Sequence, residues 1–120
     1  LNAGQELCPT DWHVPSDAEW TTLRDGLGGA SAAGEKMKEA GTTYWNTAGG
    51  TNESGFLGRP GGYRAPAGSM SFEGSRAYFW SSTDPEPDKA SAVCLSHTSS
   101  SASDDAYTWK HGFSVRCVKD

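Results

Sequence analysis

The sequence predicts an α+β fold, and three observations support this prediction. Apolar residues recur at helical spacing in the first third, short runs in the last third alternate apolar and polar residues, and Gly, Thr, Asn and Ser dominate between them. The 120 residues suffice for one domain with one core. We therefore expect residues 1–120 to form a single domain. Because the chain begins with Leu1 and not Met, we expect a mature product or a domain cut from a larger protein.

The core is expected to consist of aromatic rings more than of aliphatic side chains. Six Leu, four Val, four Phe and no Ile make up about 12% of the chain, below the roughly 20% at which disorder becomes the default expectation. Five Trp and four Tyr with a net charge of only −5 argue against disorder, because disordered chains are poor in aromatics and rich in like charge. The rings assigned to the core are Trp12, Trp20, Trp45, Phe56, Trp80 and Phe113.

The first helix is predicted over residues 16–27. Ser16 and Glu19 have the spacing of a capping box, in which each side chain accepts a hydrogen bond from the other residue's backbone N–H. Apolar residues at positions 20, 23 and 27 then follow one helical face. Gly28 and Gly29 favour a left-handed stop.

A second helix is predicted to begin at Ser31 and to end at Gly41. Its apolar face consists of Ala33, Met37 and Ala40. Its charged face consists of Glu35, Lys36, Lys38 and Glu39. This division indicates an amphipathic helix lying on the surface of the core.

Three strands are predicted in the last third, over residues 76–82, 90–96 and 112–118. In the last of these, the side chains at positions 113, 115 and 117 share one face by the two-residue period of a strand. Pro85 and Pro87 exclude residues 84–88 from a central strand because proline has no N–H to donate. The Ser-rich segment 97–111 is expected to be a long hairpin arm or loop. Residues 41–75 are expected to be irregular but ordered by their isolated rings.

The cysteine positions predict a disulfide between Cys8 and Cys117. Such a bond would tie the N-terminal segment to the last strand, and closing a loop of roughly 100 residues stabilises a fold by about 4–5 kcal/mol in the chain-entropy model. It would also indicate an oxidising, extracytoplasmic location. The alternative is three unrelated thiols. For Cys94 we favour a small buried strand residue over a nucleophile assisted by His97.

Composition argues against two classes of partner. The ten basic residues are scattered through an acidic chain, so we expect no nucleic-acid binding through phosphates. No apolar run approaches the ~18 residues of a membrane span, so we expect no direct membrane insertion.

Residues 8–20, Cys-Pro-Thr-Asp-Trp-His-Val-Pro-Ser-Asp-Ala-Glu-Trp, resemble the opening of the Fibrobacter succinogenes major paralogous domain. Further matches follow in order at 41–46 (GTTYWN), 52–56 (NESGF), 60–64 (PGGYR), 78–83 (YFWSST) and 112–118 (GFSVRCV). The resemblance covers residues 8–120. Asp11 departs from it, because Gly is expected there, and the tract 97–109 is individual to this chain.

The resemblance implies a C-type-lectin-like fold, in the branch shared with formylglycine-generating enzymes and the variable proteins of diversity-generating retroelements. It implies two helices, a small twisted antiparallel sheet, long irregular loops, and N- and C-terminal segments that meet. The resemblance also implies an extracellular or outer-membrane location in Bacteroidota or Fibrobacterota. In the variable proteins, the C-terminal segment displays ligand-contacting side chains, and residues 112–116 are similar to their ending.

A ligand-binding surface is predicted in the C-terminal part, where rings, hydroxyls and carboxylates suit a sugar or a protein partner. The alternative is that several rings belong to the core, which we favour for Trp80 and Phe113. One of Tyr78 and Phe79 is expected outside, because strand neighbours point to opposite faces. Tyr107 and Trp109 are expected to be the exposed pair, and the acidic pair 104–105 also fits a solvated turn. The predicted ligand-binding residues are Tyr78, Asp84, His97, Asp104, Asp105, Tyr107, Trp109 and His111.

No metal site, cofactor or catalytic residue is predicted. The triplet 86–88 (Glu-Pro-Asp) resembles the one by which calcium-dependent lectins hold sugar, but Lys110 places a cation where a carboxylate is needed, so we favour a proline-stiffened turn. The related formylglycine-generating enzymes use two neighbouring cysteines, whereas Cys94 and Cys117 are far apart in sequence. The three histidines have no metal spacing, and His13 is expected to be a structural hydrogen-bonding residue.

We therefore expect a non-catalytic extracellular module that recognises a glycan or a surface protein through residues 76–88 and 97–111, with residues 8–65 as its scaffold. A sharper hypothesis is the variable domain of a retroelement-diversified protein, because adenine mutagenesis of AAY codons yields the residue types that fill 97–108. The alternative is a structural or assembly module of a bacterial surface protein or filament that has no ligand of its own.

Overall fold

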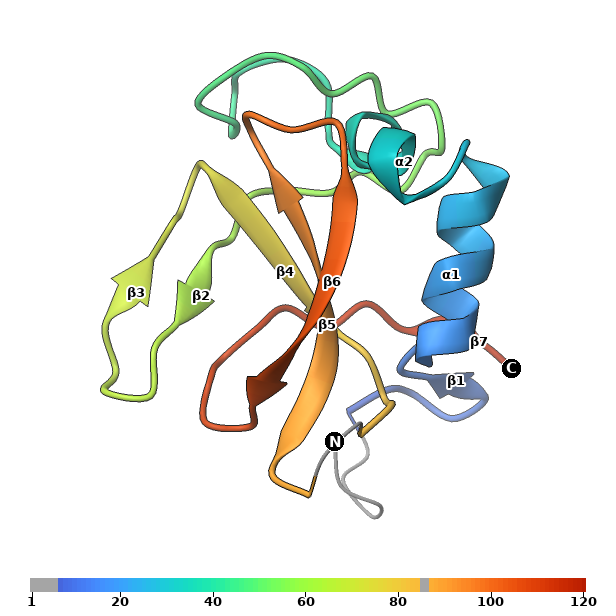
Figure 1. Ribbon diagram of the computed structural model, residues 1–120, viewed down its shortest axis with the longest axis vertical. Helices are drawn as coiled ribbons and strands as arrows, with labels where there is room; N and C mark the ends of the chain where they lie inside the picture. The colour runs from blue at the N-terminus through green and yellow to red at the C-terminus, as the bar shows by residue number, and fades with distance from the viewer. Residues whose placement is uncertain (1–6, 85–86) are drawn as a thin grey trace.

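Two helices and three small antiparallel sheets make up the described parts of the computed structural model, which are residues 7–84 and 87–120 (Figure 1). The helices are α1 (Asp17–Gly26) and α2 (Ala30–Met37). The central sheet has the order β4 (Arg76–Trp80), β5 (Lys89–Ser96), β6 (Ala102–Thr108). The two-stranded sheets pair β1 (Trp12–His13) with β7 (Val118–Lys119) and β2 (Tyr63–Arg64) with β3 (Met70–Ser71). This arrangement confirms the predicted α+β class.

Helix α1 begins as the sequence predicts. The Ser16 Oγ accepts from the Glu19 N–H at 3.3 Å, and the Ser16 N–H donates to the Glu19 Oε1 at 3.1 Å, so the capping box is complete. The helix ends at Gly26, one residue early, and Gly28 then adopts the left-handed conformation. Its Trp20 is buried in the core.

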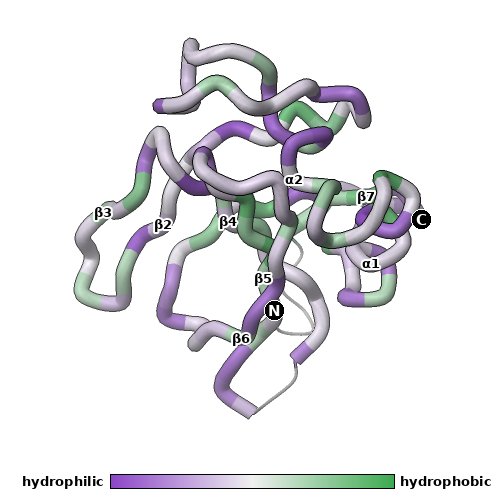
Figure 2. Tube along the Cα trace, turned by 45° about the horizontal axis from the view of Figure 1, so that its top comes forward, coloured by the Kyte–Doolittle hydropathy of each residue, from purple (hydrophilic) through white to green (hydrophobic). Residues whose placement is uncertain are grey.

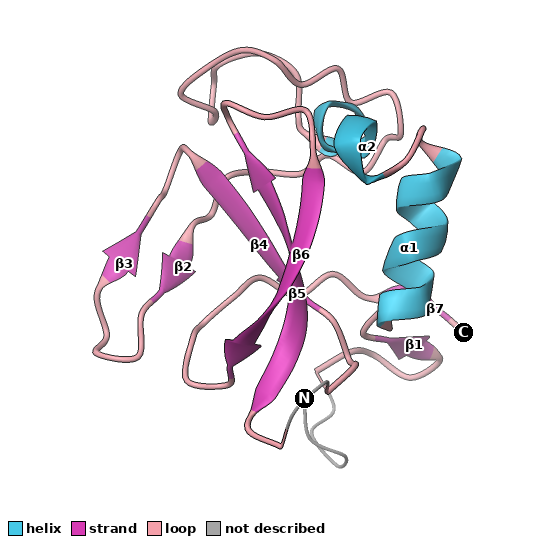
Figure 3. Ribbon diagram, viewed as in Figure 1, coloured by secondary structure: helices cyan, strands magenta, loops and turns pink. Residues whose placement is uncertain are grey.

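Helix α2 is shorter than predicted and ends at Met37, not near Gly41. The helix ends there because the carbonyl of its last residue, Met37, accepts a hydrogen bond from the Gly58 N–H at 2.8 Å. Lys38 is therefore extended, with φ −72° and ψ 141°, and is only 3% exposed. Its predicted place on the charged, solvated face is wrong. Residues 38–62 then run as the long irregular loop that Figure 3 shows beyond α2.

The central sheet contains two of the predicted strands, and its third strand lies in the segment 97–111, which is expected to be a hairpin arm or a loop. Strand β4 pairs with β5 in the register Tyr78↔Cys94, and β5 pairs with β6 in the register Cys94↔Ser103. The pairing of β5 with β6 confirms the hairpin-arm alternative for the segment 97–111 and makes residues 102–108 a regular strand. In Figure 2 the middle of β4 and β5 is hydrophobic, whereas much of β6 is hydrophilic.

The predicted strand 112–118 is wrong as a continuous element. The segment contacts three different partners through isolated bridges and a short pair: Gly112 lies opposite Arg64, Ser114 lies opposite Phe79, and only residues 118–119 form β7. Because its partners lie in three places, no single ladder extends along it. Of its predicted common face, Phe113 is half-buried while Val115 is exposed.

The β4–β5–β6 sheet has a core on each face, and this corrects the prediction that Tyr78 or Phe79 lies outside. Tyr78 is 4% exposed and Phe79 is 5% exposed, although they point to opposite faces. One face packs against the helices and is here called the helix-side core. It consists of Trp20, Ala33, Met37, Trp45, Ala77, Phe79, Val93, Leu95 and Ala102, with Leu23, Leu27 and Phe56 packed against it. The other face packs against rings from loops.

Segments near the two ends of the described chain meet in a terminal clasp made of β1, β7 and the predicted disulfide. Cys8 and Cys117 are bonded, with an S–S distance of 2.03 Å, which confirms the prediction. The His13 Nδ1 lies 2.6 Å from the Asp120 Oδ1 and its Nε2 lies 2.9 Å from the Glu19 carboxylate, so His13 is a hydrogen-bonding residue as expected. Asp120 first, and then Glu19, raise the pKa of His13.

Two residues at the clasp differ from expectation. Trp12 is 44% exposed, so its assignment to the core is wrong: the two-residue strand β1 has no second layer over that side chain. Asp11, where the resemblance leads us to expect Gly, has φ +68°. Asp is one of the few residues other than Gly that adopt this left-handed region readily, so the turn is kept without Gly.

Candidate functional site

The face of the sheet opposite the helices carries a continuous group of rings, here called the aromatic layer. Its strands supply Tyr78, Trp80 and Tyr107, and the segment that follows β6 folds back to add two more rings. The β2–β3 hairpin, beside β4 in Figure 1, adds a further one. The layer consists of Tyr63, Tyr78, Trp80, Tyr107, His111 and Phe113.

Phe113 lies at the centre of this layer. Its ring centroid is 4.3 Å from that of Trp80, 4.9 Å from that of Tyr78 and 5.0 Å from that of Tyr107. It also packs against Tyr63 and His111 at 5.9 and 5.4 Å. Each favourable ring pair contributes about 0.5–1.5 kcal/mol beyond the burial of its area. Phe113 therefore stabilises the face that it helps to form.

Two main-chain links keep the Phe113 segment on the sheet. The Trp80 N–H donates to the Ser114 carbonyl and the Ser114 N–H donates to the Tyr78 carbonyl, both at 3.0 Å. The Gly112 and Arg64 backbones exchange two hydrogen bonds, at 2.8 and 2.9 Å. The layer is thus held by backbone contacts to β4 on one side and to the hairpin on the other.

Burial governs the ionisation of the polar groups in this region. It raises the pKa of Tyr107 to about 12, with smaller contributions from the charges of Tyr78, Cys94 and Asp105. It also raises the pKa of Tyr78, whose hydroxyl lies 3.2 Å from the Arg76 guanidinium. At neutral pH both phenols are therefore protonated and can donate as well as accept hydrogen bonds.

Three large apolar side chains stand exposed at the edge of the aromatic layer and are here called the exposed rim. Trp109 is 42% exposed in the turn between Tyr107 and His111. Phe72 is 43% exposed and stacks on Tyr63, with the Arg76 guanidinium 4.3 Å from its ring centroid. Met70, on β3, is 54% exposed. Tryptophan and arginine are enriched among residues that dominate protein-binding energies.

The structure divides the predicted ligand-binding residues into groups. Tyr107, Trp109 and His111 come together at the layer and its rim, and Asp105 is exposed on the same face of β6. Tyr78 is in the layer but buried, so it supports other rings from below. This placement corrects its prediction as an accessible contact.

The other predicted residues lie elsewhere. Asp104 points to the helix side, where its carboxylate lies 3.4 Å from the buried Arg24 guanidinium. His97 follows the far end of β5 and its Nδ1 lies 2.9 Å from the Thr47 hydroxyl. Asp84 is exposed beyond β4. These three do not join the aromatic layer. The two-residue strand period turns Asp104 to the opposite face, and His97 and Asp84 lie beyond the ends of their strands.

Sequence reasoning missed the contribution of the β2–β3 hairpin. Tyr63, Met70 and Phe72 lie in the Gly- and Ser-rich middle third, where no period indicates which side chains share a face. The available indication was the isolated rings themselves, which a solvated loop would not need. Pairing them with the C-terminal segment required the Arg64–Gly112 contact, which no local pattern encodes.

Cys94 lies on the aromatic side of β5, half-buried and unbonded. Burial raises the pKa of its thiol, which disfavours the thiolate that nucleophilic chemistry requires. The Nδ1 of His97 lies 2.9 Å from the Thr47 hydroxyl.

Within residues 7–84 and 87–120, no group of three or more His, Cys, Asp or Glu side chains could hold a metal ion. Glu86, part of the calcium-like triplet, lies outside the described residues. Neither helix of the described chain has the length and apolar character needed to cross a membrane.

Comparison with known proteins places the chain by sequence. The family model described as the Fibrobacter succinogenes major domain matches residues 1–119. Searches of curated proteins and of solved structures found no match.

Proposed function

The chain belongs to the Fibrobacter succinogenes major domain family, and on that premise we propose that it is a non-catalytic, extracytoplasmic binding domain with a C-type-lectin-like fold. It recognises a glycan or a surface protein through the aromatic layer and its exposed rim. The observation that carries this proposal is that Trp109 and Phe72 stand exposed beside a rigid, packed group of rings.

Physical reasons favour recognition at this face. Exposed rings supply flat apolar area at a small cost in side-chain entropy, and neighbouring hydroxyl, guanidinium and carboxylate groups give direction to hydrogen bonds. Phe72 stacks on Tyr63 of the aromatic layer, so its ring is positioned before a ligand arrives, which reduces the ordering cost of binding. The disulfide supports an extracytoplasmic location, because such bonds persist in oxidising compartments.

The test is a screen on a glycan array and on a panel of purified bacterial surface proteins, using the native domain and two single variants, Trp109→Ala and Phe72→Ala. We expect a detected ligand to lose at least tenfold in affinity with either variant, because truncation of an aromatic anchor at a binding hot spot costs about 2 kcal/mol or more, and tenfold corresponds to about 1.4 kcal/mol.

Trp12→Ala is the matched control. Trp12 is 44% exposed, much like Trp109, but it belongs to the terminal clasp. If every detected interaction survives both rim variants, the binding role of this face is wrong and the structural or assembly module becomes the better description.

A sharper form of the proposal is that β6 belongs to the variable segment of a retroelement-diversified protein. The strand exposes Ser103, Asp104 and Asp105 in succession, so substitutions there would alter the surface more than the core. The genomic neighbourhood decides: a template repeat and a reverse transcriptase gene are expected nearby, and their absence would rule out this form.

A further inference from the structure

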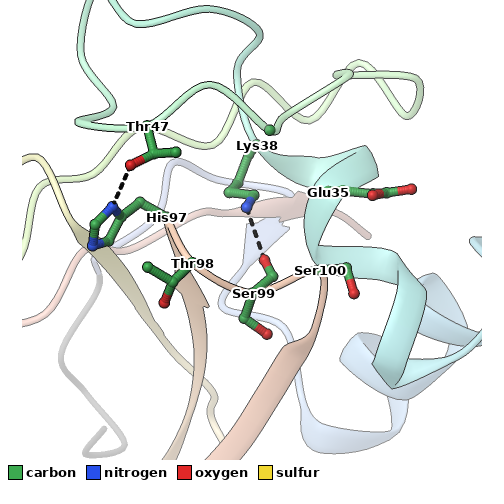
Figure 4. Close-up of a pocket in the computed structure, with 8 residues that line it drawn as sticks. Glu35, Lys38, Thr47, His97, Thr98, Ser99 and Ser100 are labelled. Carbon is green, nitrogen blue, oxygen red and sulfur yellow. Dashed lines mark hydrogen bonds between the residues drawn. The ribbon is translucent and has the colours of Figure 1, made fainter.

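Lys38 is a buried cation whose described partners are neutral. Its Nζ donates to the carbonyl oxygens of Ser96 and Ser99, each at 2.8 Å, and lies 5.6 Å from the Trp45 ring centroid. Among the described residues it forms no ion pair within 4 Å. Glu35 influences it only at longer range, and in Figure 4 the Glu35 side chain points away from it. Burial accordingly lowers the pKa of Lys38.

The ammonium borders a pocket of about 410 Å³. An ammonium has three N–H groups, and the two carbonyls account for two of them. Gly49 also borders this space: a Cβ built on it would lie 3.9 Å from the Lys38 Nζ. The missing side chain at position 49 therefore leaves the ammonium approachable from the pocket.

The remaining wall is rich in hydroxyl groups. Figure 4 shows residues that line the pocket from α2, from the loop after it and from the turn after β5, and besides Lys38 they include Glu35, Thr47, His97, Thr98, Ser99 and Ser100. No described lining residue has a large apolar side chain. The Ser100 hydroxyl donates to the Ser31 carbonyl at 2.8 Å and the Thr47 hydroxyl is engaged with His97, but each oxygen retains a lone pair that can accept from a ligand hydroxyl. A polar wall of this kind matches a polyhydroxylated ligand better than an apolar peptide side chain.

We propose that this pocket binds a carboxylate-bearing sugar of the hexuronate class, with the carboxylate on the Lys38 ammonium and the sugar hydroxyls along the Thr47, His97 and Ser100 wall. The carboxylate supplies the counter-charge that the described residues do not give Lys38, and an ammonium–carboxylate hydrogen bond is among the stronger kinds.

This site is separate from the aromatic layer. The pocket lies beyond Ser96 at one end of β5, whereas Trp109 lies beyond Thr108, which pairs with Lys89 at the other end. An eight-residue strand spans about 26 Å. Failure of one site therefore leaves the other intact, and the two proposals are tested independently.

The experiment is a titration of the native domain with glucuronate and galacturonate, followed by ¹⁵N-resolved NMR and calorimetry, with glucose and acetate as comparison probes. We expect at least one uronate to bind at least tenfold more tightly than glucose or acetate, with chemical-shift changes confined to Lys38 and residues 47–49 and 97–100. Affinity should fall several-fold when the ionic strength rises from about 0.05 to 0.5 M, because salt screens the charge pair.

Two variants test the geometry. Lys38→Met removes the charge and should abolish uronate binding, but it also removes two hydrogen bonds from the 96–99 turn. Gly49→Leu keeps Lys38 and its partners and fills the space, so it should weaken uronate binding at least tenfold. Gly26→Leu, at a glycine with nothing within 4 Å of an added Cβ, and Trp109→Ala are controls expected to bind as the native domain does.

Several results would overturn the proposal. Absence of uronate binding at tens of millimolar would refute the site, and unchanged binding by Gly49→Leu would refute its location. Acetate binding as tightly as a uronate would reduce it to a simple anion site, and glucose binding as tightly would remove the role of the carboxylate.

Discussion

On one side of the central sheet, Phe79 and Leu95 lie beneath α1, α2 and Trp45. On the other side, Tyr78 and Trp80 are covered by rings from the segment after β6 and from the β2–β3 hairpin. The helices that cover the first side are held by their own backbone hydrogen bonds, and their outward-facing residues form the molecular surface there. The second covering consists of rings whose outer edges are themselves the molecular surface. A side chain there serves packing and display together, and the two roles separate only at the exposed rim.

The largest expected effect comes from removing a ring on the helix side. Phe79 packs on Trp20 and Phe56, with centroids 6.1 and 5.2 Å away. Phe79→Ala should lower the free energy of unfolding by about 4 kcal/mol, since the helices and the sheet cannot collapse into the cavity. Urea denaturation measures this loss. A loss below about 1 kcal/mol would show that the helix-side core collapses into the cavity.

Removing the central ring of the other face should cost less. Phe113→Ala is expected to lower the free energy of unfolding by about 2–3 kcal/mol, because the ring contacts five others but is only half-buried. The same urea experiment applies, with Val115→Ala as a neighbouring exposed control. A loss equal to that of Phe79→Ala would mean that the two coverings are equivalent.

The pH dependence of stability at high pH tests how deeply Tyr107 is buried in the aromatic layer. Its pKa of about 12 in the folded chain lies above the ordinary value of 10, so the folded state holds the proton to higher pH than the unfolded state does. This stabilisation is fully present below pH 10 and is lost as pH rises to about 12. The difference in unfolding free energy between the native chain and Tyr107→Phe should shrink across that window in pH-resolved denaturation. A constant difference would indicate that the phenol is solvated.

The smallest expected effect on stability belongs to the rim. Trp109→Ala should change the free energy of unfolding by less than about 0.5 kcal/mol, because substitutions at exposed positions outside special features have small effects. Thermal denaturation of this variant beside Trp12→Ala provides the measurement. A loss above about 1.5 kcal/mol would place Trp109 in the core and remove its availability for a ligand.

The same contrast explains which features were predictable from sequence. The capping box and the apolar spacing of α1 act over a few residues, so the sequence indicates them directly, and the terminal disulfide was favoured by the placement of Cys8 and Cys117. The sequence leaves the segment 97–111 open between a hairpin arm and a loop, because the stability of β6 comes from pairing with β5 and not from its polar residues. The early end of α2 depends on Gly58, which lies 21 positions beyond Met37.

The candidate sites were predictable only in part. The exposure of Trp109 followed from its polar surroundings, but the burial of Tyr78 depends on a second covering of the sheet that no strand pattern reveals. His97 was chosen as a ligand contact for the same surface as Tyr107, yet β5 places the two at opposite ends. The pocket beside Lys38 depends on a helix that stops one turn early, which the charged pattern of 35–39 concealed.

The bond between Cys8 and Cys117 has a mechanical consequence. Tension applied to the domain through its two ends passes from one cysteine to the other through a covalent bond, and the 108 residues between them carry none of that load. Stretched out, that hidden segment would span about 380 Å, so reduction of one bond would convert a short, inextensible link into a long compliant one. In its oxidised form the domain can be pulled by its ends without deformation of either face of its sheet.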